Sequence, residues 1–179
     1  MQSLNLPKRH KQLDKRLTAI AGLVRDGAVV CDVGTDHAYL PCYLSRLGKH
    51  RRIYACDLNE GPLEFARATI EKQKQELKSD VILLQSNGLQ RVPPPENGQI
   101  CDVIIAGMGG ELIAEIIANM PPGFKNDDLR LILQPMTKQQ DLRQALLTTG
   151  YEIILEKEVS ENNRIFTIIY SKEKTHDHS

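Results

Sequence analysis

Two strand-like runs near the C-terminal end of the sequence lie so close together that they restrict the possible folds more than any other feature. The runs read YEIILEKEV (residues 151–159) and RIFTIIYS (residues 164–171), and only SENN separates them. So short a connection cannot hold the crossover helix that two parallel strands require, so the runs are predicted to form an antiparallel hairpin. Any sheet that includes both runs is therefore antiparallel at this end.

The preceding sequence alternates between apolar runs and helical patterns. Five strand-like runs begin near residues 28, 51, 80, 101 and 129. Helical patterns follow four of them, and the third is followed by RVPPPENGQ, which is expected to be a stiff surface connection. This alternation predicts a parallel sheet with helices on both faces, and near-continuous apolar runs agree with strands that are covered on both sides. An amphipathic helix with Leu13, Leu17 and Ile20 on one face precedes the first run.

A five-unit α/β sheet that ends in an antiparallel hairpin is the layout of class I S-adenosylmethionine (AdoMet) methyltransferases, whereas NAD-binding domains normally continue with parallel units. The predicted fold is therefore an α/β, Rossmann-like class I methyltransferase with a mostly parallel seven-stranded sheet. We expect residues 28–171 to form this domain, residues 1–27 to form a helical segment packed on it, and residues 172–179 to be a disordered tail. Fold alone does not establish the chemistry.

Composition and charge exclude several classes of protein. The 179 residues are 41% hydrophobic and carry 23 basic and 23 acidic side chains, so the net charge gives no general case for nucleic-acid binding. No run is long and apolar enough to cross a membrane, and no secretory signal begins the sequence, which predicts a cytoplasmic protein. The cysteines form no CxxC pair and are expected to be buried, reduced and free of metal: Cys31, Cys42, Cys56 and Cys101.

The carboxyl ends of the parallel strands are the expected ligand site, because ligands of doubly wound sheets bind there. Asp32 and Gly34 end the first strand, and a glycine lets a ligand approach the backbone. Asp57 ends the second strand, 25 residues after Asp32, and either accepts hydrogen bonds from both hydroxyls of a ribose or acts only as a turn aspartate. Asn87 and Gly88 end the third strand and either bind an adenine edge or form a plain turn.

Three glycines follow the fourth strand in AGMGGEL. Gly107, Gly109 and Gly110 are expected to leave an open patch where a flat substrate reaches the backbone, and the alternative is a tight strand-to-helix turn. The fifth strand ends in Gln134 and Pro135, which would add a polar lip to the same edge.

Seven motifs occur in order along nearly the whole chain: LDKRL, CDVGTDHAYLP, NEGPL, NGL, IIAGMGGELI, LQPM and GYEI. In this combination the sequence resembles the bacterial tRNA (adenine-N1) methyltransferases that modify adenine 22 in the D-arm. The DHAYLP and AGMGG blocks are the most specific parts of the resemblance. It implies a class I fold, AdoMet as the methyl donor and N1 of a tRNA adenine as the acceptor, in an enzyme that we expect to be a monomer.

The resemblance also implies roles for individual residues. The AdoMet pocket would be lined by Asp32, Gly34, Asp57, Leu58, Asn87, Gly88, Gly107 and Met108. Asp36 and His37 would be the catalytic residues, and substrate contacts would come from Lys15, Arg16, Tyr39 and Gly109. Lys15 and Arg16 belong to a basic cluster that begins at Lys8 and is expected to contact tRNA phosphates, whereas a second cluster, residues 49–52, is expected to be solvated surface charge.

Two roles are possible for Asp36, one in catalysis and one as a helix cap. Adenine N1 carries a lone pair and needs no prior deprotonation, but the methylated base is cationic. We therefore expect Asp36 to stabilise that charge and to take a proton from the exocyclic amine. The alternative is that Asp36 only caps the helix that begins within TDHAYL. His37 would orient Asp36, touch the base, or simply occupy the first helical turn.

The sequence departs from the family pattern in three places. The chain stops nine residues past Tyr170, where family members carry a helical extension thought to help grip tRNA. Asn87 stands where Asp is more common, and Thr35 stands where Ser is common. The other functions considered are an AdoMet-dependent methyltransferase for a small molecule or a protein, a non-catalytic AdoMet-binding module, and an NAD oxidoreductase.

Overall fold

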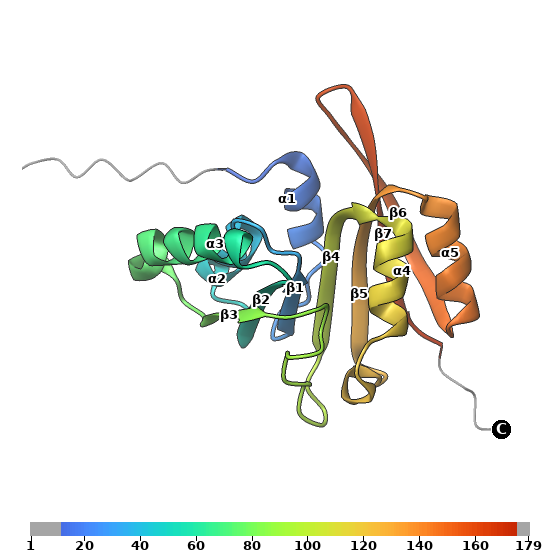
Figure 1. The fold of residues 1–179 in the computed structure, drawn as a ribbon, viewed down its shortest axis with the longest axis horizontal. Helices are drawn as coiled ribbons and strands as arrows, with labels where there is room; N and C mark the ends of the chain where they lie inside the picture. Colours follow the sequence, from blue (N-terminus) through green and yellow to red (C-terminus); the bar gives the residue numbers. More distant parts are fainter. Residues whose placement is uncertain (1–11, 175–179) are drawn as a thin grey trace, which may run out of the picture.

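The structure, a computed structural model, describes residues 12–174 and contains one mixed sheet of seven strands (Figure 1). The strands are β1 (Val29–Val33), β2 (Arg52–Asp57), β3 (Val81–Gln85), β4 (Cys101–Gly109), β5 (Leu129–Thr137), β6 (Tyr151–Glu161) and β7 (Arg164–Glu173). The helices are α1 (Lys15–Ala21), α2 (Tyr39–Leu47), α3 (Glu60–Gln73), α4 (Gly110–Ala118) and α5 (Gln139–Thr148), with short 3-10 turns at Lys74–Glu76 and Pro122–Phe124. The basic residues 8–11 and tail residues 175–179 lie outside the described part.

The strand order is β3-β2-β1-β4-β5-β7-β6, and the first five strands of this order are parallel. β7 pairs antiparallel with both β5 and β6, which confirms the predicted hairpin and the predicted fold class. Asn162 and Asn163 form the turn of the hairpin with φ of 49° and 60°, the backbone that a two-residue turn of type I′ requires. β7 extends to Glu173, so it includes the first two residues of the expected tail.

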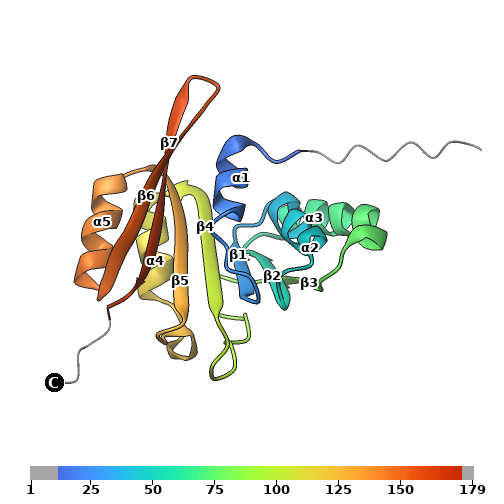
Figure 2. The same cartoon turned by 180° about the vertical axis from the view of Figure 1, so that it is seen from behind.

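Helices cover both faces of the sheet, as the alternating pattern predicts (Figure 2). On one face, α1 and α2 bury Ile20, Leu40 and Leu44 against the sheet. On the other face, α4 and α5 contribute apolar side chains such as Ile113 and Leu142 to the larger core cluster. All four cysteines are buried and free, as expected.

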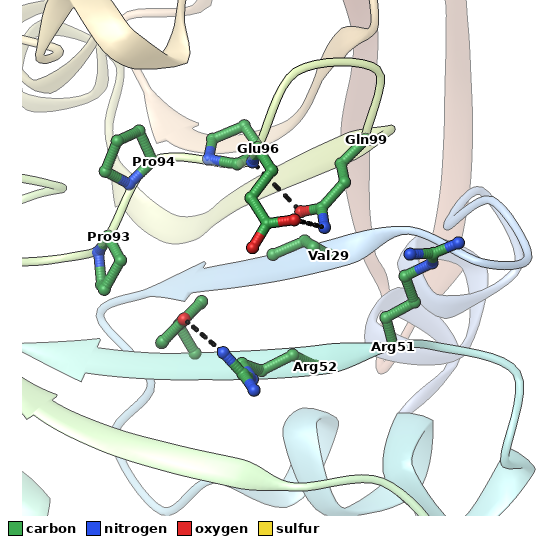
Figure 3. Close-up of a pocket in the computed structure, with 9 residues that line it drawn as sticks. Val29, Arg51, Arg52, Pro93, Pro94, Glu96 and Gln99 are labelled. Atoms are coloured by element: carbon green, nitrogen blue, oxygen red, sulfur yellow. Dashed lines mark hydrogen bonds between the residues drawn. The ribbon is translucent and has the colours of Figure 1, made fainter.

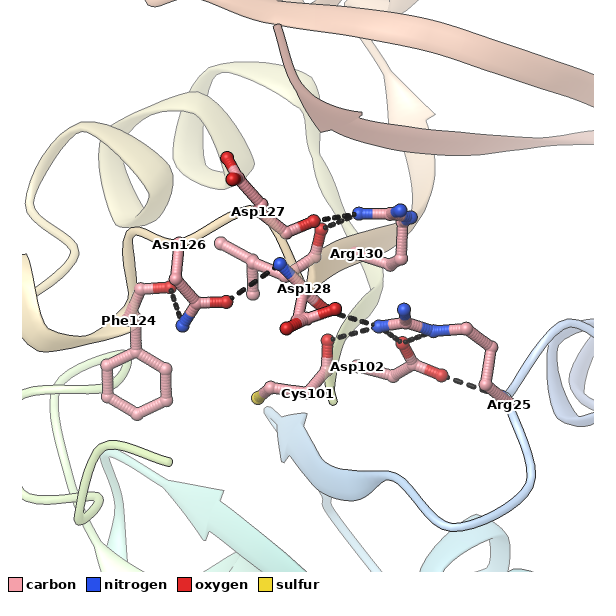
Figure 4. A network of polar contacts seen from close by, with 9 residues as sticks. Arg25, Cys101, Asp102, Phe124, Asn126, Asp127, Asp128 and Arg130 are labelled. Atoms are coloured by element: carbon pink, nitrogen blue, oxygen red, sulfur yellow. Dashed lines mark hydrogen bonds and ion pairs between the residues drawn. The ribbon is translucent and has the colours of Figure 1, made fainter. Parts of the chain in front are cut away.

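The amino-terminal edge of the sheet is fastened by one buried ion pair. The Arg25 guanidinium donates from Nε and Nη2 to Asp102 Oδ1, over 2.8 and 2.6 Å (Figure 4). Nη2 also donates to the carbonyl oxygens of Cys101 and Asp128, and the Arg25 backbone N–H donates to Asp102 Oδ2. The loop before β1 is thereby joined to the starts of β4 and β5, on the edge opposite the carboxyl ends of the parallel strands.

Candidate functional site

A cleft of about 380 Å³ lies at the carboxyl ends of β1 and β4, where ligands of this sheet type are expected. Its lining comes from α1, the loop after β1, the start of α2 and the end of β4: Arg16, Leu17, Asp32, Gly34, Thr35, Asp36, His37, Tyr39, Leu40, Ala106 and Gly107. We call it the central cleft. It brings together both predicted catalytic residues and three residues of the predicted AdoMet pocket.

The loop that carries Asp36 and His37 does not cap α2 with a side chain. Ala38 occupies the N-cap position, in the left-handed conformation, and no side chain accepts a hydrogen bond there. Asp36 is also left-handed, with φ of 51°, and its side chain is 68% exposed. The alternative role of Asp36 as a helix cap is therefore wrong, and its carboxylate remains available at the cleft. Two non-glycine residues with positive φ in one short loop are the kind of backbone strain that gathers at functional sites.

His37 is held on three sides. Its Nδ1 lies 2.8 Å from Asp36 Oδ2. Its ring stacks between Tyr39 and Phe65, at centroid distances of 5.3 and 5.0 Å and interplanar angles of 13° and 12°. These contacts fix the imidazole, and with it one carboxylate oxygen of Asp36. Phe65, from α3, was not identified from the sequence, because nothing in its local pattern indicates a contact with the loop after β1.

Asp32 is the buried acid of the central cleft. Its side chain is almost fully enclosed, and burial, with a further contribution from the nearby Asp57 carboxylate, raises its pKa to about 6. No cation among residues 12–174 contributes to this shift. A buried carboxylate of this kind is stabilised by a positively charged ligand.

Gln134 connects three elements at the floor of the cleft. Its side chain is fully buried, and Oε1 accepts hydrogen bonds from Arg16 Nη1 at 2.6 Å and from the Gly107 N–H at 3.2 Å. Arg16 is also 3.5 Å from Asp14 Oδ2, so this predicted substrate-binding residue is a restrained guanidinium in the cleft wall. Gln134 was expected to add a polar lip to the edge of the site. It is instead buried, and its side chain connects α1, β4 and β5.

The AGMGG segment differs from the expected glycine turn. β4 continues through Gly109 with two register shifts against β5, and α4 begins directly at Gly110. Of the three glycines, only Gly107 lines the central cleft, and its φ of 80° suits glycine. A Cβ on Gly110 would overlap the carbonyl oxygen of Lys138, so Gly110 is required for packing between β4, α4 and the β5–α5 connection.

Several residues of the predicted site lie outside the central cleft. Asn87 and Gly88 line a separate pocket of about 400 Å³ beside α4, and the Met108 side chain lies against Gly34. Asp57 Oδ1 accepts the Asn59 N–H at 3.0 Å, which leaves the other carboxylate oxygen for a ligand. The remaining three are the exposed Leu58 beside Asp57, Gly109 at the N-cap of α4, and Lys15 in a groove between α1 and β6.

The second basic cluster lies at the opposite edge of the sheet. Arg51 and Arg52 border a pocket of about 290 Å³ with Glu96, Gln99 and a run of three prolines (Figure 3). His50 is only 6% exposed, and burial lowers its pKa, so the expectation of solvated surface charge is wrong for this residue.

The sheet order and the placement of the cleft define a class I methyltransferase, and a family model described as "Methyltransferase domain" matches residues 13–169. The tRNA (adenine(22)-N(1))-methyltransferase of Bacillus subtilis (strain 168) is 33% identical over 161 residues, which cover 90% of this chain. The structure of M. capricolum TrmK in complex with S-adenosyl-homocysteine is 30% identical, with a TM-score of 0.76 over 93% of this chain and 72% of that one. The chain belongs to the tRNA (adenine(22)-N(1))-methyltransferase family.

Another similar structure is that of Streptococcus pneumoniae Sp1610 in complex with S-adenosyl-L-methionine. It is 34% identical, with a TM-score of 0.81 over 94% of this chain and 76% of that one. The chain spans 65% of the length of the B. subtilis relative. Within residues 12–174, no helix combines the length and the apolar character needed to cross a bilayer.

Proposed function

We propose that the protein is an AdoMet-dependent methyltransferase that methylates N1 of adenine 22 in tRNA. The observation that carries the proposal is the placement of Asp36. Its carboxylate does not cap α2, is accessible to solvent, and is fixed beside the central cleft by His37. Membership of the family supports this reaction and acceptor: the B. subtilis relative is named a tRNA (adenine(22)-N(1))-methyltransferase, and the M. capricolum TrmK structure contains S-adenosyl-homocysteine.

The central cleft fits AdoMet chemically. AdoMet carries a sulfonium and an ammonium group, and the raised pKa of Asp32 indicates a buried carboxylate that lacks cationic compensation among the described residues. The N-terminus of α2 has no side-chain cap, which suits the carboxylate of the methionine moiety. Asp57, with one carboxylate oxygen already bonded to Asn59, would accept the ribose hydroxyls through the other. Leu58, Asn87, Gly88 and Met108 would complete the pocket.

Bound AdoMet supplies a methyl group activated by the positive charge on sulfur. The protein's task is then to hold the acceptor base in line and to accommodate the positive charge that the base gains. Asp36 is the group available for the second task, because its carboxylate stabilises the charged base and accepts the proton lost from N6. His37 acts as a positioning residue that holds Asp36 Oδ2.

We also propose that the enzyme is cytoplasmic, as a tRNA substrate suggests, and that it is a monomer. The cationic residues 8–16 would contact tRNA phosphates, with Lys15 on the exposed side of α1. The target base must leave its stacked position before its N1 can reach the cleft.

Transfer of a tritiated methyl group from AdoMet to total tRNA, followed by nucleoside analysis, tests the proposal. Wild-type protein should produce 1-methyladenosine. Asp36→Asn should lower kcat about 10²- to 10⁴-fold, as expected for loss of a general base, with unchanged affinity for AdoMet by calorimetry. Asp26→Asn is the matched control, because the Asp26 side chain is equally accessible, at 71% exposed, but lies at the opposite edge of the sheet.

Each outcome of this assay has a defined meaning. Absence of 1-methyladenosine with wild-type protein would exclude the tRNA reaction and favour a small-molecule or protein acceptor. AdoMet binding without turnover on any RNA would indicate a non-catalytic module. Full activity of Asp36→Asn would exclude the catalytic role of Asp36 while leaving the reaction itself intact.

A further inference from the structure

A second cleft adjoins the central cleft on the side of the C-terminal hairpin. Its volume is about 550 Å³, and its lining comes from α1, the ends of β4 and β5, and the hairpin: Asp14, Arg16, Gly107, Met136, Glu161, Asn162, Arg164 and Phe166. We call it the hairpin cleft. Arg16 and Gly107 line both clefts, so the two spaces meet at these residues.

The walls of the hairpin cleft are fixed to each other. The backbone N–H of Lys15, the first residue of α1, donates to Glu161 Oε1 at 3.0 Å. The Arg16 guanidinium lies over the Phe166 ring, 5.7 Å from its centroid, and donates to Gln134. The hairpin tip is therefore held against α1, and the Phe166 ring is oriented without any ligand.

The lining combines an aromatic ring, an exposed thioether and a cation without a partner. Met136 is 44% exposed, and Arg164 forms no ion pair with any residue in the part of the chain that the structure describes. Aromatic rings stack on nucleobases of any sequence, and arginines bind phosphates, so this combination suits a nucleotide.

The shape of the hairpin favours a large partner. The hairpin projects well beyond the rest of the molecule, next to α1 (Figure 1). A projecting arm beside an open cleft contacts a macromolecule rather than enclosing a small ligand, because small-molecule sites bury most of their ligand.

We propose that the hairpin cleft binds the acceptor nucleotide of the RNA, with its base against Phe166 and its phosphate at Arg164, and that the base reaches the central cleft past Arg16 and Gly107. This inference rests on the proposed function, which it extends by assigning the substrate half of the site. Phe166 and Arg164 are both on β7 and were not identified from the sequence.

Steady-state kinetics with unmodified tRNA tests the inference in the full chain. Phe166→Ala and the milder Phe166→Leu should raise the KM for tRNA, the alanine variant by about 5- to 150-fold, which corresponds to one lost stack between a base and an aromatic ring. The affinity for AdoMet and the melting temperature serve as the check on folding and should change little. Ile165→Ala is the matched control, because Ile165 is the adjacent residue on β7, is 66% exposed and does not line the cleft.

Arg164 is tested through the salt dependence of tRNA binding. Arg164→Gln should make the slope of log K against log salt shallower by about 0.7 to 0.9, the contribution of one phosphate contact, whereas Lys49→Gln, at the opposite edge of the sheet, should leave the slope unchanged. Equal tRNA KM values for wild type, Phe166→Ala and Ile165→Ala, in an enzyme that does methylate tRNA, would overturn the inference alone. A wild-type protein that transfers no methyl group to tRNA would overturn the proposed function and this inference together.

Discussion

Replacement of Arg25 by alanine would leave the Asp102 carboxylate buried without its cationic partner. Asp102 has no exposed side-chain area, and Arg25 supplies both contacts to its Oδ1. The backbone N–H of residue 25 would still donate to Oδ2 in the variant, but Oδ1 would lose both donors, and the carbonyls of Cys101 and Asp128 would each lose one. The variant would therefore carry an uncompensated charge inside the protein.

Loss of one partner from a buried ion pair typically costs about 3–5 kcal/mol. Because the Arg25 side chain is 24% exposed, we expect a cost near the lower value. For a chain of this size, 3–5 kcal/mol corresponds to a fall in Tm of about 6–20 °C. The assay is urea unfolding followed by far-UV circular dichroism at pH 7, with thermal melts in parallel.

Two further variants test the reasoning. Arg143→Ala breaks the Arg143–Glu156 pair, whose side chains are 26% and 34% exposed, and should cost no more than about 1 kcal/mol. Arg25→Ala combined with Asp102→Asn removes the buried charge and should recover part of the loss. The buried charge is not the cause of the instability if Arg25→Ala lowers the free energy of unfolding no more than Arg143→Ala does. The same conclusion follows if the double variant is no more stable than Arg25→Ala alone.

Two more predictions concern pH and packing. Because the folded pKa of Asp32 lies at about 6 and its ordinary value is 3.8, the folded protein holds this proton more tightly, so the contribution of Asp32 to stability should fall by about 2 kcal/mol as pH rises from 4 to 7. When stability is measured by urea unfolding at several pH values, Asp32→Asn should lack this fall. Parallel curves of stability against pH for the two proteins would contradict the prediction. Gly110→Ala should lower Tm by about 2–12 °C through overlap with the Lys138 carbonyl, whereas Gly61→Ala, with open space around its Cα, should not; equal melting temperatures would refute the packing role of Gly110.

The order of elements and the hairpin could be predicted because they depend on local spacing. The connection between residues 159 and 164 excludes a crossover helix whatever the rest of the chain does. The start of α2 within TDHAYL was also predicted, but its cap was not. Local preference favours aspartate over alanine as an N-cap, and the contacts of His37 with Tyr39 and Phe65 hold the loop in a conformation that overrides it.

The walls of the site could not be predicted because they join residues that are distant in sequence. Gln134 reaches Arg16 across 118 positions, and neither residue type carries a local signal for this contact. The position of Phe166 in the cleft wall also has no local signal, since an aromatic residue on a strand usually indicates core packing. The roles assigned to Asp57, Asn87 and the other cofactor residues remain predictions, because Asn87 and Gly88 border a pocket apart from the central cleft.

The contacts between α1 and the last strands also determine when the site can form during synthesis. Lys15 and Glu161 are 146 residues apart, and Arg16 and Gln134 are 118 apart. Contacts of such long range form late, because the intervening chain must be ordered first. On the ribosome, α1 emerges early and can pack with α2, but Lys15 and Arg16 lack these two partners until β5 and the hairpin have followed. The nascent protein therefore has no complete cleft until almost the whole domain has been made.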